Sequence, residues 1–166
     1  SIISMEKLFL NKSQSVAFTG HRNIDGNKRP ELRVAVDNAL IELYQSGYRN
    51  FINGMAMGFD LLAASAVIAL KRRFSDVKLI AVVPYRNQSE KFSEYEQKRY
   101  QYALQNADEV IVLREKYSNG CLLRRNDYML AHASGLIAFY DGKHKGGTFY
   151  TIRKASESSM PIINLF

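Results

Sequence analysis

The sequence predicts one α/β domain of three layers, in which a mainly parallel sheet of about six strands carries helices on both faces. Short apolar runs alternate with longer segments of helical spacing, a pattern typical of strand–helix–strand units. Glycine-bearing segments follow several of the apolar runs. A chain of 166 residues, 46% of them hydrophobic, suits one domain with a sizeable core. We expect the domain to span residues 1–166, with residues 1–14 as an N-terminal extension.

The elements follow from apolar runs, helical spacing and punctuating residues. Strands are expected at residues 16–19, 50–53, 77–83, 109–113, 135–140 and 161–165. Helices are expected from Pro30 to a C-cap at Gly47, and at residues 58–74, 89–106, 121–133 and 148–158. The helix over 58–74 is apolar on nearly every face, so we expect the sheet and another layer or subunit to bury it. A homodimer would supply such a contact, and we predict a homo-oligomer.

Charge and composition narrow the function classes. The net charge of +7 favours anionic partners or serves solubility alone. Cys121 is the only cysteine, which fits a reducing compartment and gives no disulfide framework. The longest apolar run, residues 61–70, is too short to span a bilayer, and no secretory signal pattern opens the sequence. We therefore expect a cytoplasmic protein with no membrane partner. The three histidines lack metal-ligand spacing, so no metal site is expected.

Three glycine-bearing loops are expected at one rim of the sheet, at residues 19–22, 53–60 and 141–148. Ligands of open parallel sheets bind outside the carboxyl ends of the strands, where helix N-termini attract anions. Close approach of backbone to a phosphate requires glycine. The loops therefore predict a phosphate-binding site. They contain neither the G-x-G-x-x-G nor the P-loop fingerprint, which argues against a P-loop ATPase or GTPase.

Several side chains beside these loops have two interpretations. Arg22 could form a fork onto a phosphate and His21 could bond a ribose or phosphate, or both are polar loop residues. Asp60 either caps its helix or holds a ribose hydroxyl. Tyr85 follows the third strand and is a candidate for stacking on a base.

These motifs resemble those of a known family. The segments Phe18-Thr19-Gly20-His21-Arg22, Gly-Met-Ala-x-Gly-x-Asp at 54–60, Asn106-Ala107-Asp108 and Lys145-Gly146-Gly147-Thr148 are similar to the YpsA-like family. That family belongs to the SLOG superfamily, with the DprA/Smf DNA-processing proteins and the LOG nucleosidases. The resemblance implies a Rossmann-like fold that binds a nucleotide-derived phosphorylated ligand, either a nucleoside monophosphate or an ADP-ribose-like molecule.

Arg124, Arg125 and Asn126 resemble an Arg-Asn pair that lies near the ligand in superfamily members, and the alternative is an exposed basic turn. Apart from the nucleotide-like ligand, no cofactor is expected. The residues we expect to contact the ligand are Gly20, His21, Arg22, Gly54, Met57, Gly58, Asp60, Tyr85, Arg125, Asn126, Asp141, Gly142, Gly146, Gly147 and Thr148.

One departure from the LOG signature bears on catalysis. In LOG-type enzymes a glutamate follows the glycines and assists cleavage of the N-glycosidic bond, and Thr151 stands at that position here. We therefore assign no catalytic residue and favour binding or sensing over reaction. Two alternatives stay open. One is a nucleoside-monophosphate N-glycosidase or phosphoribohydrolase that uses Asp60, Asp141 or Glu157 as its acid. The other is a DprA-like nucleic-acid-binding module, for which the net charge is the motive.

Overall fold

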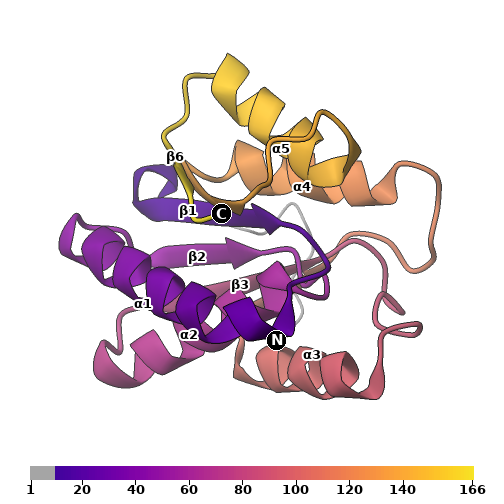
Figure 1. Ribbon diagram of the computed structural model, residues 1–166, viewed down its shortest axis with the longest axis horizontal. Helices are drawn as coiled ribbons and strands as arrows, with labels where there is room; N and C mark the ends of the chain where they lie inside the picture. The colour runs from indigo at the N-terminus through magenta and orange to yellow at the C-terminus, as the bar shows by residue number, and fades with distance from the viewer. Residues whose placement is uncertain (1–9) are drawn as a thin grey trace.

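Six parallel strands form the central sheet of the computed structural model, which describes residues 10–166 (Figure 1). Their spatial order is β4-β3-β2-β1-β5-β6, and every neighbouring pair is parallel. The strands are β1 Ser15–Gly20, β2 Asn50–Asn53, β3 Lys78–Val83, β4 Glu109–Val112, β5 Gly135–Phe139 and β6 Ile162–Asn164. The prediction of a Rossmann-like α/β domain with a parallel sheet of six strands is confirmed.

Helices cover both faces of the sheet (Figure 1). One face carries α1 Arg29–Gln45, α2 Phe59–Arg73 and α3 Glu94–Asn106. The other face carries α4 Cys121–Ala131 and α5 Gly146–Glu157. Short 3₁₀ helices lie at Lys12–Gln14 and Gly26–Lys28. None of the helices in residues 10–166 is long and apolar enough to cross a membrane.

The core is split by the sheet because successive side chains of a strand point to opposite faces. Val16 and Phe18 of β1 pack with the apolar residues of α1, α2 and α3, whereas Ala17 between them packs with those of α4 and α5. This alternation buries both faces of the central strand, and it explains why Val16, Ala17 and Phe18 are apolar in succession.

The burial of α2 has its explanation within the chain. Its buried residues belong to one cluster with the sheet and with α1 and α3, which lie on either side of it. The apolar character of this helix therefore gives no argument for a second copy, and the homo-oligomer stays a prediction.

Two helix starts differ by more than one residue from those expected. Helix α3 begins at Glu94, not at residue 89, because residues 89–92 form turns and the Ser93 hydroxyl caps the helix by accepting the Glu96 N–H. Helix α5 begins at Gly146, two residues earlier than expected. Gly146 has φ +89°, a conformation that glycine adopts without steric cost, so it can begin the helix.

The chain order reverses beside β1. From β1 the chain moves outward through β2, β3 and β4, and it then returns to place β5 on the other side of β1. The crossovers that leave β1 and β5 run over opposite faces of the sheet. A crevice therefore opens at the carboxyl ends of these two strands, which is where α/β sheets place ligands.

Candidate functional site

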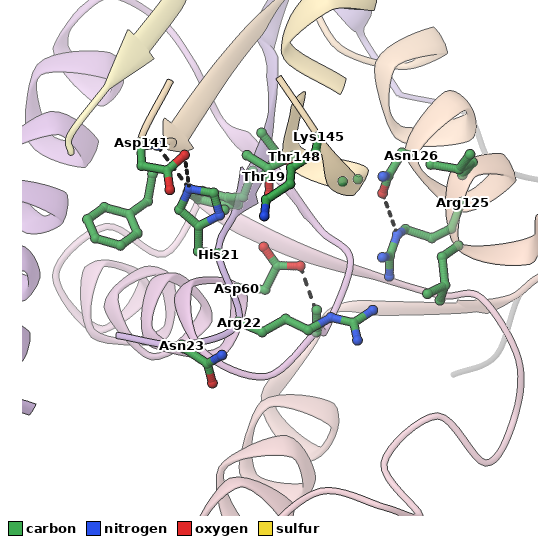
Figure 2. Close-up of a pocket in the computed structure, with 18 of the residues that line it drawn as sticks. Thr19, His21, Arg22, Asn23, Asp60, Arg125, Asn126, Asp141, Lys145 and Thr148 are labelled. Carbon is green, nitrogen blue, oxygen red and sulfur yellow. Dashed lines mark hydrogen bonds and ion pairs between the residues drawn. The ribbon is translucent and has the colours of Figure 1, made fainter. Parts of the chain in front are cut away.

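A cavity of about 860 Å³ lies at this switch point (Figure 2). Its walls come from the end of β1 and the loop after it, the starts of α2, α4 and α5, the end of β5 and the last residue of the chain. The volume is within the range of small-molecule sites. The lining residues are Phe18, Thr19, Gly20, His21, Arg22, Asn23, Asp25, Lys28, Ala56, Asp60, Tyr117, Gly120, Leu122, Leu123, Arg125, Asn126, Phe139, Asp141, Lys145, Gly146, Gly147, Thr148 and Phe166.

The structure divides the predicted contact residues into two groups. Those that line the cavity are Gly20, His21, Arg22, Asp60, Arg125, Asn126, Asp141, Gly146, Gly147 and Thr148. Those that lie outside its lining are Gly54, Met57, Gly58, Tyr85 and Gly142.

The first two glycine loops owe their glycines to packing. A Cβ on Gly20 would overlap the ring of Phe59, and one on Gly58 would overlap the backbone carbonyl of Arg22. A Cβ on Gly54 would lie 2.8 Å from the guanidinium of Arg125. Glycine is required at these positions because other protein segments approach the backbone there. The sequence predicts the close approach of a ligand instead.

The third loop is different. A Cβ on Gly146 would meet nothing within 4 Å, and one on Gly147 would meet only the Asn126 amide nitrogen, at 3.8 Å. Both glycines and Thr148 form the first turn of α5 at the wall of the cavity, and no side chain caps this helix. Unpaired N–H groups and the positive end of the helix dipole therefore border open space.

Basic side chains surround the same space. Lys145 precedes α5 and lies beside Thr148 in Figure 2, while Arg22 lies on the other side of Asp60. Lys28 also lines the cavity. With the α5 N-terminus, these groups make this end of the cavity favourable for an anion.

Arg125 is the buried cation of the site. It is 5% exposed, its Nε donates to the Asn126 side-chain oxygen at 2.8 Å, and its Nη1 donates to the Gly54 carbonyl. The same carbonyl accepts from the Gln88 side chain at 3.1 Å. Burial lowers the pKa of Arg125, and the nearby Asp60 opposes that shift. The Arg-Asn pair thus holds the second glycine loop in place and lines the cavity at once.

Asp60 is the buried acid of the site, at 4% exposure. Its Oδ2 accepts the Ala56 N–H at 3.2 Å, and its Oδ1 is covered by protein atoms without a hydrogen-bond partner. Burial raises the pKa of this carboxyl to about 6, although Arg125 and Arg22 act in the opposite direction. Of the two interpretations of Asp60, the helix cap is not met, because the N-cap of α2 is Gly58 and no side chain caps this helix. The Gly58 N–H itself donates to the Glu96 carboxylate at 2.6 Å.

His21 and Asp141 form a pair at one side of the cavity (Figure 2). The backbone N–H of Asp141 donates to His21 Nε2 at 2.9 Å, and the Asp141 carboxylate lies 3.2 Å from the same nitrogen. A nitrogen that accepts an N–H carries no proton, so this hydrogen bond requires the imidazole tautomer with its proton on Nδ1. The pKa of Asp141 is lowered, chiefly by the Lys143 N–H and then by His21.

Apolar lining residues were not predicted from the sequence. Tyr117, Leu123 and Phe166 are large and exposed at 60%, 37% and 65%, and all three line this cavity. Tyr85, the predicted stacking residue, packs edge-on against Tyr117 with ring centroids 5.4 Å apart. Only the fold brings these residues to the rim, because Tyr117 precedes α4, Leu123 lies in its first turn and Phe166 ends the chain.

The structure also sorts the three suspected acids. Asp60 is buried in the cavity wall, Asp141 lies at its side, and Glu157 ends α5 in an ion pair with Arg153 at 3.8 Å. Thr151 is buried and its hydroxyl donates to the Gly147 carbonyl at 2.9 Å. Within residues 10–166, no group of three His, Cys, Asp or Glu side chains is arranged to hold a metal ion.

Comparison with known proteins decides the family. The sequence pattern of the YpsA family, described as the YspA SLOG family, matches residues 16–162. The chain belongs to this family of SLOG proteins. The match contains every element from β1 to the start of β6, and with it all of the cavity lining except Phe166.

Curated relatives agree with this assignment. A UPF0398 protein of Bacillus licheniformis is 26% identical over 129 residues, which are 76% of this chain and 70% of that protein. A UPF0398 protein of Macrococcus caseolyticus is 31% identical over 141 residues, 80% of this chain and 76% of its own length. The uncharacterized SPbeta prophage-derived protein YoqJ of Bacillus subtilis is 31% identical over 114 residues, 61% of this chain and 66% of YoqJ. Family membership gives the fold, and the geometry of the cavity must indicate the ligand.

Proposed function

We propose that the chain binds a nucleotide-derived phosphorylated ligand, a nucleoside monophosphate or an ADP-ribose-like molecule, in the cavity at the carboxyl ends of β1 and β5. The observation that carries the proposal is the uncapped first turn of α5, whose two glycines leave open space beside Lys145 and the buried Arg125. Such a turn accepts a phosphate through backbone N–H groups.

The remaining wall suits the rest of a nucleotide. Tyr117 and Leu123 offer apolar surface on the α4 side, and Phe139 and Phe166 offer it beside His21, with ring centroids 5.1 Å apart. Aromatic and aliphatic surface with a few polar groups is the usual lining of sites for ring-containing ligands.

Isothermal titration with ADP-ribose, NAD and nucleoside monophosphates tests the proposal. We expect a dissociation constant below millimolar for at least one of them. Lys145→Ala should weaken binding by about tenfold, because a charge-assisted contact to phosphate is worth roughly 1.5 kcal/mol. The matched control is Lys78→Ala, which removes an exposed lysine at the opposite end of the sheet. Equal losses in both variants would show a general charge effect and no site.

An N-glycosidase is the second candidate, favoured by one observation. Asp60 combines burial in the cavity wall with a pKa raised to about 6, as general acids often do. In that reaction the acid would protonate the leaving base while water attacks the anomeric carbon. Release of free base from nucleoside monophosphates, lost in Asp60→Asn, would support it. The nucleic-acid-binding alternative and the cytoplasmic location stay predictions.

A further inference from the structure

We infer that the cavity binds its anionic ligand together with one proton, and that Asp60 takes up this proton. The inference rests on the proposed function and adds a second binding partner, the proton, to the same site. It begins from an apparent conflict, since a buried carboxylate lines a cavity whose other features favour an anion.

The carboxylate has little with which to balance its charge. Only Oδ2 has a hydrogen-bond partner, the Ala56 N–H, and Oδ1 is covered without one. The cations that favour its ionised form are Arg125 on α4 and Arg22 after β1, and both line the cavity that the ligand would enter. A ligand phosphate would interact with these same two cations and add its own negative charge near the carboxylate.

Two responses could relieve the repulsion, and the geometry favours one. A ligand hydroxyl could donate to the free oxygen, but protein atoms cover Oδ1 and bar direct contact. Protonation needs no such access. Because burial already raises the pKa of this carboxyl to about 6, a modest further rise makes it neutral at neutral pH.

Other ionisable groups surround Asp60, and the experiment must distinguish proton uptake by these groups from proton uptake by Asp60. The charged or titratable groups that line the same cavity are Arg22, Lys28, Arg125, Lys145, His21, Asp25 and Asp141. Behind the second glycine loop, Glu96 of α3 bonds the Gly58 N–H. Histidine is the side-chain type whose ordinary pKa lies nearest neutral pH, so His21 is the residue to replace in a control.

The test is calorimetric titration of ADP-ribose at pH 7 in buffers of different ionisation enthalpy. A diphosphate diester has no ionisation near neutral pH, whereas a phosphomonoester has one near 6 and would confuse the count. We expect uptake of more than about 0.5 protons per ligand, and affinity that weakens by up to about tenfold per unit as the pH rises from 6.5 to 8. Asp60→Asn should remove both effects, and His21→Gln should keep the uptake.

The outcomes separate the two proposals. Binding without proton uptake, or uptake that Asp60→Asn leaves unchanged, overturns this inference and leaves the proposed function standing. Failure of ADP-ribose, NAD and the nucleoside monophosphates alike to bind at any pH, with circular dichroism showing folded protein, counts against the proposed function and removes this inference with it.

Discussion

Replacing Asp60 by asparagine should stabilise the chain at neutral pH. The folded-state pKa is about 6 against an ordinary 3.8, so folding favours the protonated acid. Its contribution is fully present below pH 4 and is lost as the pH rises through about 6. A rise of about two units, at about 1.4 kcal/mol each, corresponds to roughly 3 kcal/mol. Asparagine keeps an acceptor for the Ala56 N–H and carries no charge.

Urea unfolding of both proteins between pH 4.5 and 8 measures this difference. We expect Asp60→Asn to exceed the wild type by up to about 3 kcal/mol at pH 7.5, and by only about 1 kcal/mol at pH 4.5. Asp37→Asn, on the exposed side of α1, serves as the control and should stay within about 0.5 kcal/mol at every pH. A stability difference independent of pH, or loss of stability at pH 7.5, would refute the assigned burial of the charge.

Three further predictions concern the loops. Gly58→Ala should lower the free energy of unfolding by about 3 kcal/mol or more, because φ is +81° and the Cβ would overlap the Arg22 carbonyl. Gly142→Ala, with φ +87° and open space around the Cβ, should lower it by about 1 kcal/mol, and chemical denaturation compares the two variants. Asn53→Ala should cost about 3 kcal/mol in the same assay, since this buried side chain donates to the Asp60 carbonyl and accepts the Met55 N–H, which holds Met55 at φ 63°. Gly147→Ala should leave the melting temperature unchanged or higher while weakening ligand binding measured by calorimetry; unchanged binding would contradict the placement of the phosphate.

Much of the fold could be predicted from local pattern. The run at residues 77–83 and the glycine that ends β1 place strands within a residue or two, because apolar periodicity and punctuation are local properties. Errors fell at the starts of α3 and α5, where capping decides the boundary. A serine or glycine near a helix start can be inside the helix or before it, and only the hydrogen bonds tell which.

The burial of α2 shows a second limit. The apolar residues of α2 indicate that the helix is buried on several sides, but composition cannot say whether α1, α3 or another subunit buries it. The same holds for Asp60. A carboxylate at a helix start is ordinarily a cap, and its partial pairing becomes visible only when the Ala56 N–H and the covered Oδ1 are placed.

By itself the sequence determined a parallel α/β sheet whose loops at one rim carry glycine, and its motifs indicated the family. Tertiary structure alone decided what each glycine does. Gly20, Gly54 and Gly58 make room for other parts of the chain, and Gly146 and Gly147 face an open cavity. The physical reason is that glycine permits close approach without specifying what approaches, and the neighbour comes from residues distant in the sequence, such as Arg125 against Gly54.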